Sequence, residues 1–98
     1  MKFVQTMSVR TADVAALAGL MEAWHDAEAG NAPGYEGNRL LADRDEPGKY
    51  TIVVFFSSAE AAERNNDRPE TQQWGAKLGA VIDGQPEFGN YDEIHTTG

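Results

Sequence analysis

The sequence predicts a single α+β domain in which strands and helices follow one another in the order β-α-β-β-α-β. Its 98 residues are enough for one hydrophobic core but too few for two. Hydrophobic residues make up 41% of the chain and charged residues 24%, as is typical of a globular protein. Segments rich in β-branched and aromatic residues alternate with segments whose apolar residues recur at helical spacing. We therefore expect residues 1–98 to form one domain.

The N-terminal part of the chain is predicted to form a strand and then a long helix. The segment "KFVQTMSV", residues 2–9, is short and rich in β-branched residues, as strands are. A helix is expected over residues 12–28, with Thr11 as its N-cap and Asp13 near the positive end of its dipole. The turn residues of "GNAPGYEG" end this helix. Its apolar stripe is expected to comprise Val14, Leu17, Ala18, Met21 and Trp24, and to end at Glu28.

The middle of the chain has the pattern of a β-hairpin followed by a short helix. A rather polar strand, "YEGNRLLADRD", is predicted over residues 35–45, and the turn "DEPGK" follows it. This turn is short enough to join the strand to "YTIVVFF", residues 50–56, as a hairpin. The segment "SSAEAAERNN" then predicts a short helix, in which Ser57 and Glu60 have the spacing of a capping box.

The segment "RNNDRPETQQW", residues 64–74, is predicted to be a junction between two helices. Pro69 lacks the N–H that a helix interior needs, but proline is well tolerated in a first helical turn. Asp67 and Glu70 have capping-box spacing around it. The second helix is expected to run to about Ile82, with a shared face formed by Thr71, Trp74, Leu78 and Val81.

A last strand, "EFGNYDEI", is expected over residues 87–94, after the turn residues "DGQP". With it, the chain has the order of a split βαβ, or ferredoxin-like, domain whose second helix is broken in two. The sheet of such a domain is antiparallel, and its helices lie on one face.

The strand over residues 50–56 predicts a partner for the other face of that sheet. Tyr50, Ile52, Val54 and Phe56 alternate with a second set, Thr51, Val53 and Phe55. Both faces are therefore largely apolar, whereas the helices of one chain can cover only one of them. We expect a homodimer in which a second copy of the sheet covers the other face. The alternative is that this face stays mixed in character and exposed.

Charge and composition exclude several classes of function. Eight basic residues against sixteen acidic ones give a net charge of −8, which disfavours partnership with nucleic acid or with an anionic membrane surface. The chain has no cysteine, so neither a disulfide nor a thiolate site can form. No segment approaches the roughly 20 apolar residues that span a bilayer, and no leader peptide is evident. We expect a cytoplasmic location.

The chain resembles the dimeric α/β-barrel superfamily, and within it the antibiotic biosynthesis monooxygenase-like domains. The resemblance is carried by "FFSSAEAAERNNDRPETQQW", in which Phe56, Ser58, Glu60, Ala61 and Pro69 match the pattern of the family. It implies a homodimer whose two sheets form a barrel, with a pocket between the sheet and the helices of each subunit. Some relatives oxidise polyphenolic aromatics with molecular oxygen and need neither a metal nor an organic cofactor. Others degrade haem.

The sequence departs from these relatives at two places. Many relatives have a histidine in the short helix, where this chain has Asn65 and Asn66. Haem-degrading relatives need an asparagine on the first strand, where this chain offers Thr6 and Ser8. They also need a tryptophan and an iron-binding histidine on the last helix. Trp74 could stand for the tryptophan, but that helix has no histidine, so haem chemistry is not expected.

Five residues are candidates for binding a small aromatic ligand: Trp24, Tyr35, Arg39, Asn66 and Trp74. The tryptophans could offer a flat wall and an N–H donor, although both could equally be core residues. Asn66 could donate a hydrogen bond to a substrate oxygen, or it could simply cap a helix in the left-handed conformation. Tyr35 and Arg39 lie on the polar strand and could orient a phenolate. For Arg39 the alternative is a surface ion pair.

The sequence supplies no convincing catalytic base and no metal site. His25 and His95 lack metal-ligand spacing, and we expect a solvated His25 at a helix end and an unstructured His95 in the tail. Two functions remain: a cofactor-independent monooxygenase-like homodimer acting on a small aromatic metabolite, or a non-catalytic dimeric module that binds a small molecule or pairs subunits. A titratable side chain in the pocket would favour catalysis over binding.

Overall fold

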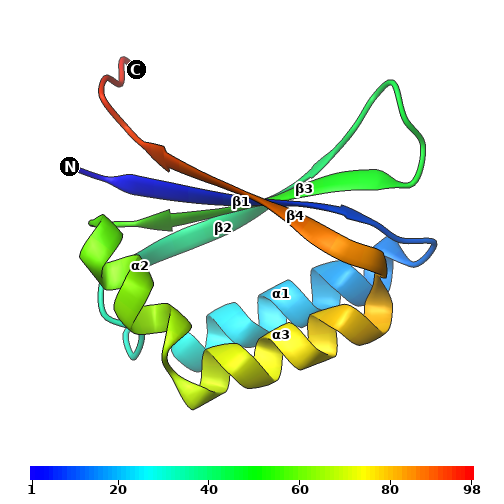
Figure 1. Ribbon diagram of the computed structural model, residues 1–98, viewed down its shortest axis with the longest axis horizontal. Helices are drawn as coiled ribbons and strands as arrows, with labels where there is room; N and C mark the ends of the chain where they lie inside the picture. Colours follow the sequence, from blue (N-terminus) through cyan, green and yellow to red (C-terminus); the bar gives the residue numbers. More distant parts are fainter.

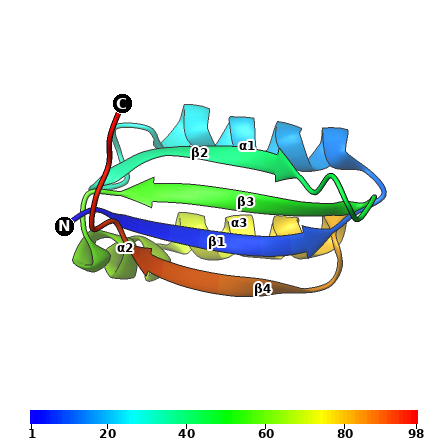
Figure 2. The same cartoon turned by 90° about the horizontal axis from the view of Figure 1, so that it is seen from above.

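The computed structural model describes residues 1–98 and confirms the ferredoxin-like α+β fold. A four-stranded antiparallel sheet has all three helices on one face (Figure 1). The strands lie side by side in the order β2-β3-β1-β4, with α1 along the β2 side and α3 toward β4 (Figure 2). The elements are β1 Phe3–Arg10, α1 Val14–Glu28, β2 Tyr35–Ala42, β3 Lys49–Phe56, α2 Ala59–Asn66, α3 Pro69–Val81 and β4 Asp83–Asp92.

The core lies between the helices and the inner strands β1 and β3. It includes Leu17 of α1, which is fully buried, and Ile52 of β3, which is 1% exposed. Val14 and Ala18 were expected on the apolar stripe of α1, but both are exposed, because this helix turns only a narrow face toward the sheet. The buried cluster comprises Met7, Val9, Leu17, Met21, Ile52, Leu78 and Ile82.

The start of α1 differs from the prediction. Asp13, not Thr11, is its N-cap, and the Asp13 carboxylate accepts a hydrogen bond from the N–H of Ala16 at 3.0 Å. Thr11 is buried, and its hydroxyl accepts from the N–H of Asp13 and donates to the carbonyl of Val81 at 2.6 Å. A buried hydroxyl needs such partners, so Thr11 ties the end of α3 to the start of α1 instead of capping a helix.

The α2–α3 junction forms around Pro69, as predicted, but neither expected capping box does. Pro69 is at the first helical position of α3. Ser58 rather than Ser57 caps α2, and its hydroxyl accepts from the N–H of Ala61 at 3.1 Å. The Ser57 N–H is instead hydrogen-bonded to the carbonyl of Gly34 at 2.8 Å, which holds Ser57 in the strand-to-helix turn.

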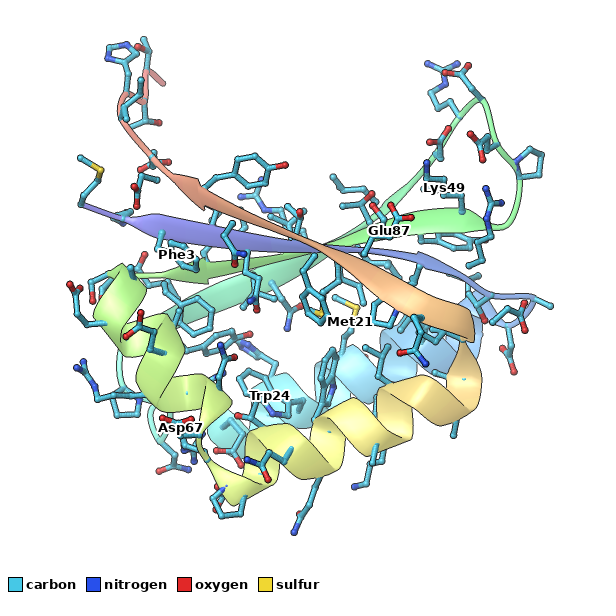
Figure 3. The ribbon with its side chains drawn as sticks, viewed as in Figure 1. Phe3, Met21, Trp24, Lys49, Asp67 and Glu87 are labelled. Atoms are coloured by element: carbon cyan, nitrogen blue, oxygen red, sulfur yellow. The ribbon has the colours of Figure 1, made fainter.

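Arg68 takes the N-cap position of α3, where no side chain provides a cap. Asp67, expected to start a capping box, is the C-cap of α2 and lies at the junction of the two helices (Figure 3). The side chain of Arg68 points back to α1 and forms an ion pair with Glu28 at 2.6 Å. Glu28 is buried, and this ion pair explains why the apolar stripe of α1 can end on a carboxylate.

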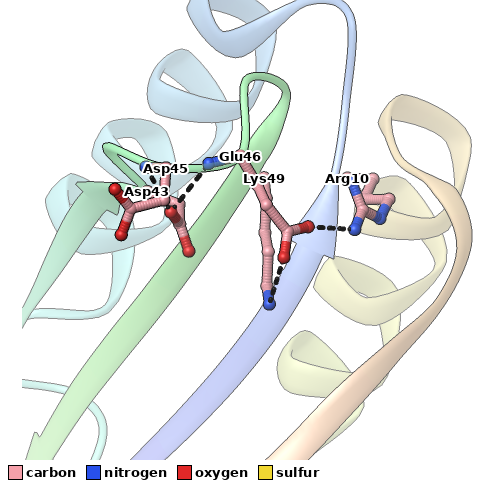
Figure 4. A network of polar contacts seen from close by, with 5 residues as sticks. All are labelled: Arg10, Asp43, Asp45, Glu46 and Lys49. Atoms are coloured by element: carbon pink, nitrogen blue, oxygen red, sulfur yellow. Dashed lines mark hydrogen bonds and ion pairs between the residues drawn. The ribbon is translucent and has the colours of Figure 1, made fainter.

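The β2–β3 turn is closed by a polar network (Figure 4). The Asp43 carboxylate accepts from the N–H groups of Asp45 and Glu46 at 2.8 and 3.0 Å, and these two bonds lower the pKa of Asp43. Glu46 pairs with Arg10 at 2.5 Å and with Lys49 at 4.0 Å. Because Asp43 turns the chain in this way, β2 ends before it and not at Asp45 as expected.

The last strand begins earlier than predicted. β4 starts at Asp83, so "DGQP" lies inside the strand and is not a separate turn. Asp83 pairs with Arg10 of β1, and the register shifts between Ser8 and Arg10. An edge strand tolerates Pro86, because one side of its backbone has no neighbouring strand to accept an N–H.

The face of the sheet away from the helices is uncovered in the single chain. We call it the outer face; its apolar residues are Val4, Leu41, Val53, Phe55 and Tyr91. Leu41 is 50% exposed and Tyr91 58% exposed. The β2–β3 turn and the C-terminal tail both rise on this side (Figure 1). None of the helices has the length and apolar composition that crossing a bilayer requires.

Candidate functional site

A cavity of about 430 Å³ lies between the sheet and the helices. Its apolar lining includes Met7, Met21, Ile52, Val54, Phe56 and Leu78. Several lining residues of α3 and β4, among them Gly79 and Phe88, are also exposed to solvent. The cavity therefore opens between these two elements. A Cβ built on Gly75 or Gly79 would meet nothing within 4 Å, so two missing side chains on α3 help to keep the mouth open.

Two tryptophans form an aromatic wall of the cavity. Trp24 of α1 lies between the helices and the sheet (Figure 3), and its ring centroid is 6.5 Å from that of Trp74 on α3. The indole nitrogens of both residues are buried and have no hydrogen-bond partner. A buried donor without a partner costs free energy, and it marks a place where a ligand or water oxygen would be stabilised.

Asn65 is the amide that the sequence interpretation missed. It is 4% exposed and lines the cavity, and its side-chain oxygen accepts from the hydroxyl of Thr71 at 3.2 Å. Its side-chain nitrogen has no partner within the protein. Helical spacing could have identified it, because Asn65 follows the buried Ala61 and Ala62 by four and three residues.

Asn66, the residue predicted instead, also lines the cavity but is exposed. It is not a left-handed cap: Asp67 is the C-cap of α2, and only glycines have positive φ.

Tyr35 lies behind the aromatic wall instead of in the lining. Its ring meets Trp24 edge-on, with centroids 4.8 Å apart. Its hydroxyl accepts from the side-chain nitrogen of Asn38, a lining residue, at 2.9 Å, and lies 2.7 Å from Nδ1 of His25. Burial raises the pKa of Tyr35, while the hydrogen bond from Asn38 acts in the opposite direction. Tyr35 is therefore a neutral phenol.

Arg39 is not brought to the cavity. It pairs with Val53 on the outer face, and its guanidinium lies 5.2 Å from the ring centroid of Phe55. The expected ion pair of Arg39 with an acid does not form either. His25 is exposed, as expected, and His95 lies in the tail near Thr97. No three His, Cys, Asp or Glu side chains gather in a way that could hold a metal ion.

The polar side chains that line the cavity are all neutral: Gln5, Asn38, Asn65, Asn66, Thr71, Gln72 and Gln85, with the two indoles. Such a lining can bind a flat apolar molecule and hydrogen-bond its oxygen atoms, but it offers no group that can take up a proton. Any acid–base step in the cavity would therefore have to rely on the acidity of the bound molecule itself.

Comparison with known proteins gives one family and one fold. A family model described as antibiotic biosynthesis monooxygenase matches residues 2–77. No curated protein sequence matches the chain significantly.

Several solved structures share the fold. One from Caulobacter crescentus, named for antibiotic biosynthesis monooxygenase, has a TM-score of 0.80 and 18% identity, covering 96% of this chain and 91% of its own. One from Bordetella bronchiseptica with the same naming has a TM-score of 0.81 and 15% identity, covering 96% and 98%. SnoaB from Streptomyces nogalater, a cofactor-independent oxygenase, has a TM-score of 0.73 and 22% identity, covering 97% and 93%. At such identities the similarity establishes the fold and not the reaction.

Proposed function

Because the chain belongs to the antibiotic biosynthesis monooxygenase family, we propose that its cavity binds a small aromatic metabolite and supports oxidation of that metabolite by molecular oxygen. One observation carries the proposal: Trp24 and Trp74 line one apolar cavity, and the indole N–H of each is buried without a hydrogen-bond partner. An aromatic ligand with a ring oxygen would fill the space and accept from an indole. A volume of about 430 Å³ suits a ligand of two or three fused rings.

The neutral lining limits which substrates could react. With no base in the wall, the substrate must itself be an acidic phenol or enol, which can give an electron to oxygen. Oxidation of a ring methylene to a carbonyl then balances without an external reductant. One atom of O₂ forms the carbonyl, and the other leaves as water with the two methylene hydrogens. Neither a metal nor an organic cofactor is needed for this stoichiometry.

The absence of a titratable side chain from the lining favours a second candidate function, which is binding without catalysis. Amides, a hydroxyl and indoles are sufficient to hold an aromatic ligand, and none of them can transfer a proton at neutral pH. A dimeric module that stores or carries such a molecule would have the same cavity.

Oxygen uptake with a dihydroxyanthrone, whose ring methylene is acidic, separates the two functions. We expect uptake above the uncatalysed rate, with kcat/KM lowered about fivefold to tenfold in Trp74→Phe, which keeps an aromatic ring but loses one N–H. Gly79→Leu should lower kcat/KM more than tenfold, because its side chain fills the opening of the cavity. Leucine favours a helix more than glycine does, so destabilisation of α3 would not explain this loss.

Gly19→Leu is the matched control, because Gly19 is an exposed glycine of α1 outside the cavity lining, with nothing near its Cβ position. Saturable binding of the anthrone without oxygen uptake would support the non-catalytic function. Uptake that is unchanged in both cavity variants would contradict the site.

We also propose that the functional unit is a homodimer joined through the outer face. Val53 and Phe55 of the inner strand β3 lie on that face, and Leu41 and Tyr91 flank them with about half of their area exposed. An apolar patch of this kind on a sheet without a covering layer favours pairing with a second copy about a two-fold axis.

Val53→Lys tests this assembly, because it places a charge at the centre of the outer face. We expect sedimentation to give a dimer of about twice 10.7 kDa for the parent chain and a single 10.7 kDa subunit for the variant. Gln73→Lys introduces the same charge on an exposed position of α3 and should leave the dimer intact. A parent chain that sediments as one subunit at micromolar concentration would reject the proposal.

A further inference from the structure

We propose that Asn38 is the specificity-determining residue of the cavity and that Tyr35 and His25 are its positioning residues. They hold the Asn38 amide so that its carbonyl oxygen accepts a hydrogen bond from a hydroxyl group on the bound aromatic. The inference rests on the proposed function, because it concerns the ligand of the same cavity.

The direction of the hydrogen bonds follows from the chemistry of the three groups. The Asn38 side-chain nitrogen can only donate, so at 2.9 Å the Tyr35 oxygen must accept from it. A neutral phenol has one proton, and the nearest acceptor for that proton is Nδ1 of His25, at 2.7 Å. The series of hydrogen bonds therefore runs from the Asn38 amide to the Tyr35 phenol and on to the His25 imidazole. The Asn38 side-chain oxygen is left without a protein partner on a residue that lines the cavity.

An irregularity of β2 brings these groups together. Residues three apart on a regular strand face opposite sides of the sheet, so Asn38 and Tyr35 could not meet. Here the register shifts between Tyr35 and Gly37, and Gly37 has a φ of 139°. As a result Tyr35 pairs with Phe56 and Asn38 with Val54, both on the helical side. β-Bulges commonly re-aim a side chain beside a functional site.

The position of Tyr35 is fixed independently of Asn38. Its N–H donates to the carbonyl of Ala32 at 3.2 Å, and its ring packs edge-on against Trp24 and against Phe56. A ring held on two sides keeps its hydroxyl in place, and that hydroxyl in turn fixes the amide. His25, which is exposed, is the last member of this series of hydrogen bonds, at its solvent side.

The residues that line the cavity thus include one unpartnered acceptor on β2 and two unpartnered donors on the helices. Asn38 offers a carbonyl oxygen, while Trp24 and Trp74 offer their indole N–H groups. A ligand that carries a hydroxyl group fits the β2 side better than the same ligand with that hydroxyl methylated, because the ether has no proton to donate.

Binding of 1-naphthol and of 1-methoxynaphthalene compares these two cases directly. The chain has two tryptophans, both in the cavity wall, so its two indole N–H signals in a nitrogen–proton NMR spectrum report binding at this site. We expect 1-naphthol to bind about tenfold more tightly than the ether, the ratio that one well-made hydrogen bond provides.

Variants locate the origin of that preference. Asn38→Leu, and Tyr35→Phe to a lesser degree, should bring the tenfold ratio towards one. His25→Ala should weaken the preference, and His25→Asn should restore it, because the asparagine oxygen can accept the phenolic proton where Nδ1 did.

The outcomes separate this inference from the proposed function. If neither naphthalene shifts the indole signals, the cavity does not bind aromatics and the proposed function fails. Equal binding of both compounds by the parent chain, or a preference that survives in Tyr35→Phe and Asn38→Leu, would overturn the roles of these residues and leave the cavity function standing. A preference for the ether would likewise overturn the assignment of the Asn38 oxygen as the acceptor for a ligand hydroxyl.

Discussion

Arg68→Ala is expected to lower the free energy of unfolding by about 3 kcal/mol, because it leaves a buried carboxylate without its counter-charge. The carboxylate belongs to Glu28, whose side chain is 11% exposed, and the Arg68 side chain is 21% exposed. Their 2.6 Å contact joins the α2–α3 junction to the end of α1. The partial exposure of Arg68 places the expected loss at the lower end of the range for buried pairs.

Thermal unfolding at a single protein concentration measures this loss, and the midpoint should fall by roughly 15 °C for a domain of this size. Arg64→Ala is the control, since Arg64 is exposed on α2 and forms no ion pair; it should change the midpoint little. The double variant Glu28→Gln/Arg68→Met removes both charges and should recover most of the stability. If Arg68→Ala behaved like Arg64→Ala, the ion pair would have no structural role.

Gly34→Ala should cost about 3 kcal/mol, for two separate reasons. Gly34 has a φ of 78°, which disfavours any residue with a Cβ. A Cβ at this position would overlap the Cβ of Ala61 and come within 2.6 Å of the Ser57 hydroxyl oxygen. Ala61 is 1% exposed and held within α2, so it cannot move aside cheaply.

Gly30→Ala separates the two contributions. Gly30 has a similar φ of 86°, but nothing lies within 4 Å of its Cβ position. We expect a loss of about 1 kcal/mol there, from backbone strain alone. Chemical denaturation of the two variants at equal concentration gives the comparison. Equal losses would show that close packing against α2 contributes nothing at Gly34.

The confirmed predictions depend on local chemistry. Pro69 starts α3 because proline lacks an N–H whatever its surroundings, and the alternation in β3 is a property of the strand itself. The capping residues were missed by one or two positions. Asp13 and Ser58 cap where Thr11 and Ser57 were expected, because neighbouring residues of similar chemistry differ only in their tertiary contacts.

The candidate site was only partly predictable. Trp24 and Trp74 both line the cavity, as helical periodicity predicts for the inner faces of their helices. Asn66 was chosen over Asn65 although only the latter is buried. Arg39 was predicted to line the cavity but lies on the outer face, near Phe55. Tyr35 does not line the cavity either, but packs against Trp24, which does.

The order of the elements, the break at Pro69 and the two apolar faces of β3 follow from the amino-acid sequence alone, because each segment carries its own spacing and backbone chemistry. The side of the sheet that each β2 residue faces, in contrast, depends on how β2 pairs with β3. The register shift at Gly37 reverses the alternation of the strand, and it sets Tyr35 and Asn38 on the helical side while Arg39 faces outward. A shift of one residue moves a side chain through the sheet, and pairing with β3, not composition, fixes that shift.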